Sequence, residues 1–199
     1  NTNMLSDYAA IKNGSYGKLM KAYYAKQDAE KLSGKGDTSQ KLTLMKTSAD
    51  SLKKSADALN DSSLWEKKKI KKKDEKTGEE IEVEDYDWDK ITKAVKSFVE
   101  DYNDVVKEAG ESNTKDVLRN ASWMTGMTDK NSNMLAKIGI TIGKGNKLEL
   151  DEDALKQADI SSLKTVFTGY NSFVSKISQK ATGISNAANR ASATYTNNG

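Results

Sequence analysis

The sequence of 199 residues contains no cysteine, no histidine and no proline. Without cysteine and histidine, the chain can form no disulfides, has no thiolate or imidazole chemistry, and lacks the usual zinc ligands. Without proline, it lacks the strongest helix breaker, which permits long uninterrupted helices. We therefore expect a fold that is held together by helix packing and assembly rather than by cross-links.

Long hydrophobic runs are also missing. No apolar stretch approaches the roughly 20 residues needed to cross a bilayer, and the first residues do not have the pattern of a signal peptide. Because Asn1 is not an initiator methionine, we expect the sequence to be a piece of a longer protein. The missing apolar run argues against membrane insertion, and the net charge of +3 is small for this length, so we do not expect a nucleic-acid partner either.

Several segments carry apolar residues at steps of three and four, the spacing of a helix with one apolar seam. Thr38 or Ser39 is the expected N-cap of the first full seam, and Thr114 that of the third. Trp123 and Met127 belong either to the core or to a contact surface. The predicted seams cover residues 42–59, 91–109, 117–135 and 163–195, and a shorter helical pattern covers residues 19–32.

Two short segments alternate in the manner of β-hairpins. In the first, residues 66–85, six lysines surround Ile70 and face an acidic run around Val83, with a turn ending at Gly78. Opposite charges across strands contribute only about 0.2–1 kcal/mol per pair. The lysines could instead bind nucleic acid or anionic lipid, but the acidic strand would cancel their field within a Debye length.

In the second predicted hairpin, residues 138–150, four apolar side chains share one face. Its turn, residues 143–146, contains glycine and asparagine, which tolerate positive φ. Asp151 then caps a helix, because its carboxylate can accept from the free N–H groups of the first turn. The apolar face consists of Ile140, Ile142, Leu148 and Leu150.

The order of these pieces resembles the C-terminal half of the flagellar filament-capping protein family, of the FliD or hook-associated protein 2 type. The resemblance covers about residues 88–188. It rests on Ser97 to Asn103 (SFVEDYN), Leu118-Arg119, Leu135 to Ile140 (LAKIGI), Lys147 to Asp151 (KLELD), Leu155 and Val166-Phe167.

The resemblance implies a secreted, non-enzymatic structural protein at the tip of a bacterial flagellar filament, exported without a visible signal peptide. It also implies self-association through terminal helices, and flagellin-like filament subunits as partners. The family carries large β-rich outer domains in mid-chain, where this sequence has only some twenty residues. The alternative is a surface-associated protein-binding module without a filament role.

A search for catalytic or ligand-binding motifs finds only near misses. The segment from Gly139 to Lys144 mimics a phosphate loop, but its spacing is one residue short and no serine or threonine follows the lysine. The acidic run from Asp151 to Asp153 lacks the glycine and the distal glutamate of a calcium loop. We therefore predict no enzymatic activity, no cofactor and no metal site.

Candidate subunit contacts are tyrosines near the start of the chain and small or apolar residues on the last seam. Tyrosine is enriched at interfaces, and small residues allow helices to approach closely. Packing within the bundle is the other interpretation of the tyrosines. The candidates are Tyr16, Tyr23, Tyr24, Ile184, Ala188 and Tyr195.

The fold predicted from these patterns is mainly α. We expect one domain, residues 1–199, built as an elongated antiparallel helical bundle with heptad seams. Two small β-hairpins, residues 66–85 and 138–150, complete it, and the first protrudes from the bundle as a charged insertion.

Overall fold

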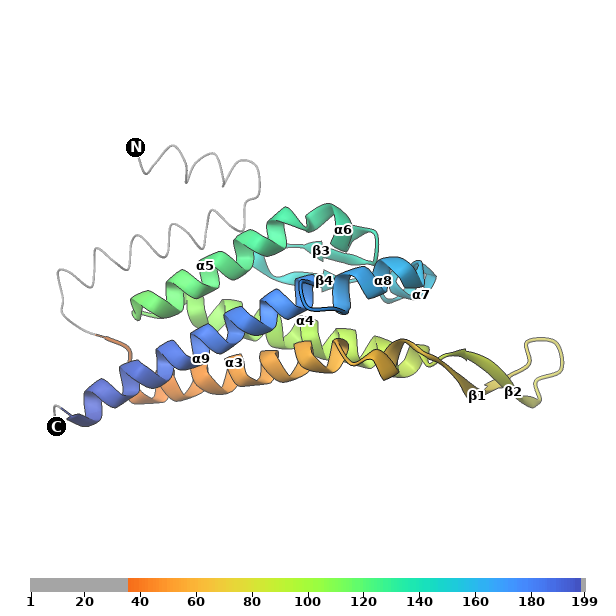
Figure 1. Ribbon diagram of the computed structural model, residues 1–199, viewed down its shortest axis with the longest axis horizontal. Coiled ribbons are helices and arrows are strands. Elements are labelled where there is room, and N and C mark those ends of the chain that lie inside the picture. The colour runs from red at the N-terminus through yellow and green to blue at the C-terminus, as the bar shows by residue number, and fades with distance from the viewer. Residues whose placement is uncertain (1–35, 198–199) are drawn as a thin grey trace.

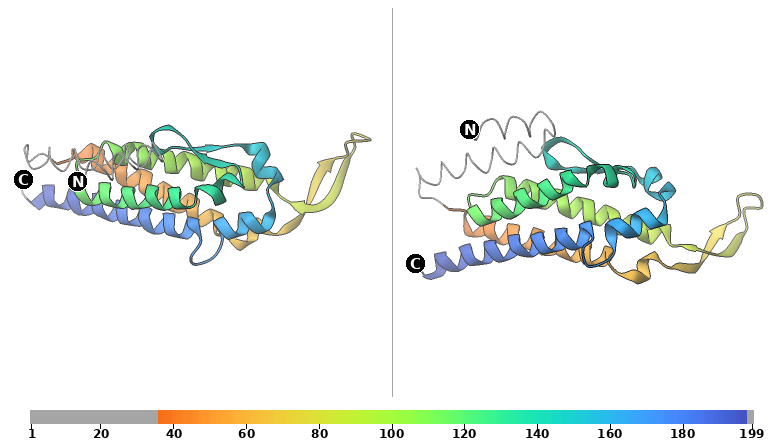
Figure 2. Two further views of the ribbon diagram at one scale, coloured as in Figure 1. Left: turned by 90° about the horizontal axis from the view of Figure 1, so that it is seen from above. Right: turned by 45° about the horizontal axis from the view of Figure 1, so that its top comes forward.

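The computed structural model describes residues 36–197, and four long helices dominate them (Figure 1). These are α3 (Ser39–Leu59), α4 (Trp88–Gly110), α5 (Lys115–Lys130) and α9 (Phe173–Asn197). They alternate in direction along one long axis, so that α3 packs between α4 and α9, and α5 covers α9 and α4 (Figures 1 and 2). The predicted mainly helical, elongated bundle is confirmed.

Shorter elements connect the long helices. They are η1 (Ser62–Trp65), β1 (Lys67–Lys73), β2 (Glu80–Tyr86), α6 (Ser132–Ala136), β3 (Ile140–Ile142), η2 (Lys144–Asn146), β4 (Leu148–Leu150), α7 (Glu152–Gln157) and α8 (Ile160–Phe167).

The apolar seams predicted for α3 and α4 form the centre of the bundle. Each fully buried large aliphatic or aromatic side chain stabilises the fold by about 1.5–3 kcal/mol. Every predicted seam residue of these two helices is buried: Leu42, Met45, Ala49, Leu52, Ala56 and Leu59 on α3, and Ile91, Val95, Phe98, Tyr102, Val105 and Ala109 on α4.

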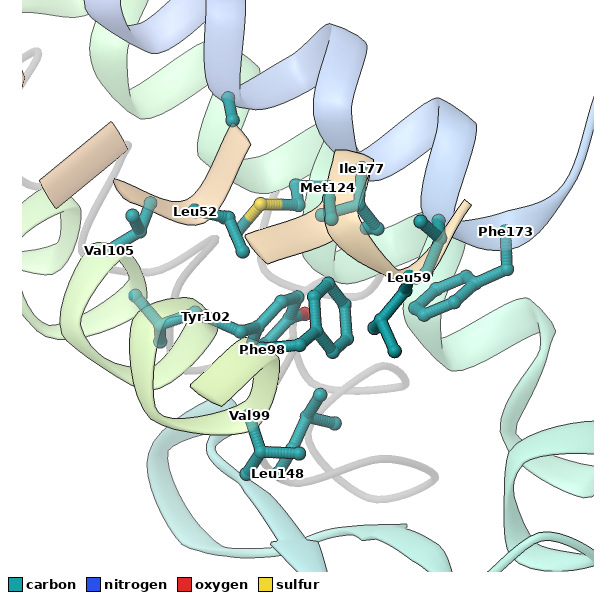
Figure 3. Packing of buried hydrophobic residues seen from close by; sticks show 14 of the residues in the cluster. Leu52, Leu59, Phe98, Val99, Tyr102, Val105, Met124, Leu148, Phe173 and Ile177 are labelled. Atoms are coloured by element: carbon teal, nitrogen blue, oxygen red, sulfur yellow. The ribbon is translucent and has the colours of Figure 1, made fainter. Parts of the chain in front are cut away.

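Aromatic rings close the core near the end of the bundle from which β1 and β2 project. The rings of Trp65 and Phe167 stack with centroids 5.5 Å apart. The ring of Phe98 packs edge to face against that of Phe167, with centroids 6.5 Å apart. It packs in the same way against Phe173, with centroids 6.3 Å apart (Figure 3). The buried indole N–H of Trp65 donates to the carbonyl of Leu59 at 2.7 Å, so this donor is satisfied.

The third predicted seam is interrupted. Helix α5 ends at Lys130 and Leu135 lies on the separate helix α6, so the prediction of one helix through Leu135 was wrong. Asn131 causes the break, because its backbone N–H donates to Thr128 and its side chain donates to the carbonyl of Met127 at 2.8 Å. Leu135 is nevertheless fully buried, so the apolar pattern survives the change of direction.

The last predicted seam is also split, between α8 and α9. Gly169 has φ of 101°, a left-handed value that ends the helix, and Tyr170 is 83% exposed. The predicted seam over residues 163–195 is therefore not one continuous helix, and the prediction was wrong in including Tyr170. The Asn60 side chain holds this turn, accepting from the N–H of Gly169 at 2.9 Å and donating to its carbonyl at 3.4 Å.

Both predicted hairpins are present as antiparallel strand pairs. In the first, Ile70 lies opposite Val83, as predicted, and the strands project beyond the bundle (Figure 1). In the second, Ile140 lies opposite Leu150. Its turn uses positive φ at Gly145 (68°) and Asn146 (65°), the conformation that the residue types predict.

Candidate assembly surface

A buried carboxylate ties the start of α3 to the turn between α4 and α5. Asp37 accepts from the hydroxyls of Ser112 and Thr114, both at 2.6 Å, and from the backbone N–H groups of Asn113 and Thr114 at 2.7 and 3.0 Å. Burial alone would raise the pKa of Asp37, but these hydrogen bonds outweigh it and hold the pKa below its usual value.

This cluster corrects one predicted cap. Thr114 occupies the N-cap position of α5, but its hydroxyl makes no capping bond and donates to Asp37 instead. The cause is the carboxylate of Asp37, a strong acceptor to which both the hydroxyl and the backbone N–H of Thr114 donate. Asp37 lies 77 positions away in the sequence, so no local pattern pointed to it.

The tyrosine–asparagine pair of the predicted resemblance joins α4 to two other elements. The buried hydroxyl of Tyr102 donates to the hydroxyl of Thr128 on α5 at 2.8 Å. The side chain of Asn103 accepts from the N–H of Leu148 at 2.7 Å and donates to its carbonyl at 3.0 Å. An asparagine side chain thus takes the place of a neighbouring strand beside β4, and fixes the second hairpin on the bundle.

The glycine of the same resemblance sits where no side chain fits. Gly139 has φ of +89°, and a Cβ there would lie 2.7 Å from the carbonyl oxygen of Asp151. The two residues are joined directly, because the N–H of Asp151 donates to the carbonyl of Gly139 at 2.8 Å. Asp151 also caps α7, accepting from the N–H of Ala154 at 3.1 Å, as predicted.

Two polar pairs link α3 to α9 across the bundle. Asp50 accepts from the hydroxyl of Ser185 at 2.6 Å, and Asp57 accepts from that of Ser178 at 2.7 Å. The two aspartates are seven residues apart on α3, and the two serines are seven residues apart on α9. Seven residues are about two helical turns, so the same antiparallel contact repeats two turns further along. Burial alone would raise the pKa of both carboxylates, but their hydrogen bonds outweigh it and lower the pKa of each. The largest of these contributions comes from the lysine one turn earlier on α3.

One aromatic side chain stands on the outer face formed by α5 and α9. Trp123 is 54% exposed, and the Nζ of Lys180 lies 4.4 Å from its ring centroid. Nearby, Gly183 lets the helices approach closely, because a Cβ there would lie 2.5 Å from the side-chain oxygen of Asn120. Trp123 therefore belongs to the surface, and not to the core, of the described residues.

The six candidate subunit contacts fall in three places. Ile184 and Ala188 are fully buried on α9, facing the other helices of the bundle. Tyr195 lies on α9, and its side chain is outside the described part of the chain. A contact with another subunit through any of these residues stays a prediction. Tyr16, Tyr23 and Tyr24 and the helical pattern of residues 19–32 lie outside the described residues.

Exposed aromatic or apolar side chains that the sequence did not single out as contacts include Tyr170, Leu44 and Ile81. Tyr170 fits the three-and-four stepping, so only Gly169 beside it signalled a turn. Within residues 36–197, no group of three or more acidic side chains is placed to hold a metal ion, and no helix is long and apolar enough to span a bilayer.

These contacts define a helical-bundle protein in which buried polar side chains join one helix or hairpin to the next. Residues 110–199, which contain α5 to α9, match the sequence family described as flagellar hook-associated protein 2 C-terminus. No curated protein and no solved structure matches the chain.

The family match confirms the resemblance to the FliD type over that segment, and it supports a structural role of the flagellar cap type. Gly139, Asp151 and the second hairpin lie inside the matched segment. Residues 88–109 of the predicted resemblance, including Tyr102 and Asn103, lie outside it. Their hydrogen bonds nevertheless join them to Thr128 and Leu148, which the match covers.

Proposed function

We propose that this chain is a non-enzymatic part of a flagellar filament cap, exported to the filament tip, where it helps to place filament subunits. The observation that carries the proposal is the family match over residues 110–199. The bundle supports it, because helices packed through long apolar seams make a rigid body suited to bearing load.

Within this proposal, the partners are other copies of the chain and flagellin-like subunits. The chain would act outside the cell, on the flagellum. The resemblance implies large outer domains at the place in the chain where this protein has the first hairpin. In this chain, β1 and β2 or the surface of the bundle would therefore make the contacts that such domains make in the family.

Tip location tests the proposal. Labelled protein, bound to filaments and viewed by electron microscopy, should mark one end of each filament and leave the shaft unlabelled. Deleting the gene should leave cells with short or absent filaments and with unassembled subunits in the medium, and the intact gene should restore filaments. Label along the shaft, or normal filaments after deletion, would contradict the proposal.

A second candidate is a surface-associated protein-binding module without a filament role. Trp123 favours it, because an aromatic side chain held half-exposed under a cation is typical of binding surfaces. Replacing Trp123 by alanine separates the two candidates. The module predicts loss of cell-surface binding, whereas the cap predicts that the tip label persists.

A further inference from the structure

The charged hairpin has two chemically opposite edges. Strand β1 (KKKIKKK) presents lysines along its whole length, and β2 (EIEVEDY) presents acidic residues. In the described residues, the main contacts of β1 and β2 are with each other. An isolated two-stranded hairpin is marginally stable in water and gains from additional strands.

The backbone groups that point away from the hairpin belong to the charged residues. The N–H of Asp74 donates to the carbonyl of Glu79 at 2.8 Å, which makes Lys73 and Glu80 a pair without mutual hydrogen bonds. Such pairs alternate with hydrogen-bonded pairs along an antiparallel ladder. The outward N–H and C=O groups therefore belong to Lys67, Lys69, Lys71 and Lys73 on β1, and to Glu80, Glu82, Glu84 and Tyr86 on β2.

We propose that β1 of one copy pairs edge to edge with β2 of a second copy, so that the hairpins of neighbouring chains form a continuous sheet. The inference deepens the proposed function, because it rests on the self-association expected of a cap. The outward backbone groups of the lysine edge would meet those of the acidic edge. The strands would run antiparallel, as Lys71 and Glu82 already do within one chain.

Charge decides which edges can meet. Two β1 edges would place lysines opposite lysines, and two β2 edges would place carboxylates opposite carboxylates, and like charges directly opposite each other are destabilising. Lysine-rich edges ordinarily protect strands from unwanted pairing. Here the acidic edge of another copy would neutralise the lysines, so unlike edges can pair whereas like edges cannot.

One face of the hairpin carries its three apolar side chains, beside the Lys72–Asp85 ion pair, and it adds to the contact. Ile70, Ile81 and Val83 share the face opposite to Lys69 and Lys71, and Ile81 is 39% exposed. Any register that pairs the outward groups places Ile70 of one copy on the same face as Ile81 and Val83 of the next. Edge pairing would therefore lengthen an apolar strip as well as a ladder of opposite charges.

The shape of the molecule favours a closed or helical array. The strands project from one end of the bundle, outward along its long axis (Figures 1 and 2). Copies that stand side by side with parallel long axes would bring unlike edges together. Such a head-to-tail contact uses two different surfaces of each chain, and it generates a ring when the rotation closes.

Because the chain has no cysteine, single introduced cysteines report this contact cleanly. We would mix the K71C and E82C variants of the chain at high concentration and treat them with a short thiol-specific linker. The expected result is a cross-linked dimer in the mixture at severalfold the yield of either variant alone. High salt should lower that yield, because the exposed charges are screened.

A proline on the lysine edge supplies the blocking variant. In K69P the lost N–H points outward, so the hairpin itself should survive while the edge can no longer pair. K69P in the K71C chain should remove the cross-link, and K69A should retain it. Hairpin integrity is checked in one chain carrying both K71C and E82C, where the intramolecular linkage should form with or without K69P.

Equal yields in the mixture and in the single variants, or a cross-link that survives K69P, would overturn the edge pairing. No cross-link at all would also overturn it, and would leave the lysine edge to a strand of another protein or to an anionic surface. If tip labelling persists while the cross-link is absent, this contact is wrong and the cap proposal stands. A cross-link without tip labelling would retain the contact and contradict the cap.

Discussion

The missing side chain of Gly139 decides how the second hairpin meets α7. The backbone there is left-handed, and a Cβ would press on the carbonyl oxygen of Asp151 and on the N–H of Leu155 at 2.7 and 3.0 Å. The close approach of these two backbone segments thus explains why a glycine stands between the two isoleucines of the LAKIGI motif.

We expect Gly139→Ala to destabilise the fold by about 1–3 kcal/mol from backbone strain, with the steric clash adding to the loss. Gly145→Ala is the matched control, because φ is also positive there but nothing lies within 4 Å of the added Cβ. Urea unfolding followed by circular dichroism compares them. Equal losses for both variants would show that the approach to Asp151 does not matter.

Asp37 gives a pH-dependent prediction. Its pKa in the folded state lies below the ordinary 3.8, so the carboxylate stabilises the fold above that value, and the contribution disappears as the pH falls through the folded pKa. We expect Asp37→Asn to cost about 1–3 kcal/mol near neutral pH. The difference from the unmodified chain should shrink in acid, and a difference that stayed constant would contradict the assignment.

At the scale of elements, the sequence predicted the buried faces well and the helix ends less well. Apolar spacing identified the seams of α3 and α4 because burial is repeated over many residues. The breaks at Asn131 and Gly169 were missed, because Leu135 and Tyr170 happen to continue the three-and-four stepping. The partners of Asp37 and Asn103 could not be predicted, since each bond joins residues that are distant in the sequence.

Two positions on α3 test the seam directly. Leu52 is fully buried, whereas Leu44 on the same helix is 49% exposed. We expect Leu52→Asp to destabilise the bundle by about 3–5 kcal/mol, because it buries a carboxylate without a partner. Leu44→Asp should change stability by no more than about 0.5 kcal/mol. Thermal melts of the two variants should therefore separate, and similar melts would contradict the seam.

The charged hairpin should be separable from the core. Replacing residues 67–84 by a short glycine–serine loop removes β1 and most of β2 but keeps Trp65 and Tyr86. We expect the helical circular-dichroism signal and cooperative unfolding to remain. Trp65→Ala, by contrast, removes a buried ring stacked on Phe167, and should cost about 3–5 kcal/mol. Loss of cooperativity after the loop replacement would place the hairpin in the core.

At the scale of the whole molecule, the chain lacks the covalent features that slow refolding. Uncatalysed proline isomerisation takes about 10–100 s, and this sequence has neither proline nor cysteine. We expect refolding from denaturant to be complete without such a phase, as measured by stopped-flow tryptophan fluorescence. A phase of tens of seconds whose rate is independent of protein concentration would contradict this expectation.

The arrangement of α3 and α9 has a mechanical consequence. The first turn of α3 and the last turn of α9 lie at the same end of the bundle, and the two helices run antiparallel in contact (Figure 1). Tension applied between those turns would load their contacts one after another, so that Asp50–Ser185 is reached before Asp57–Ser178. A molecule pulled in this way unzips at low force, whereas a pull along the shared axis from opposite ends would have to shear all the contacts at once.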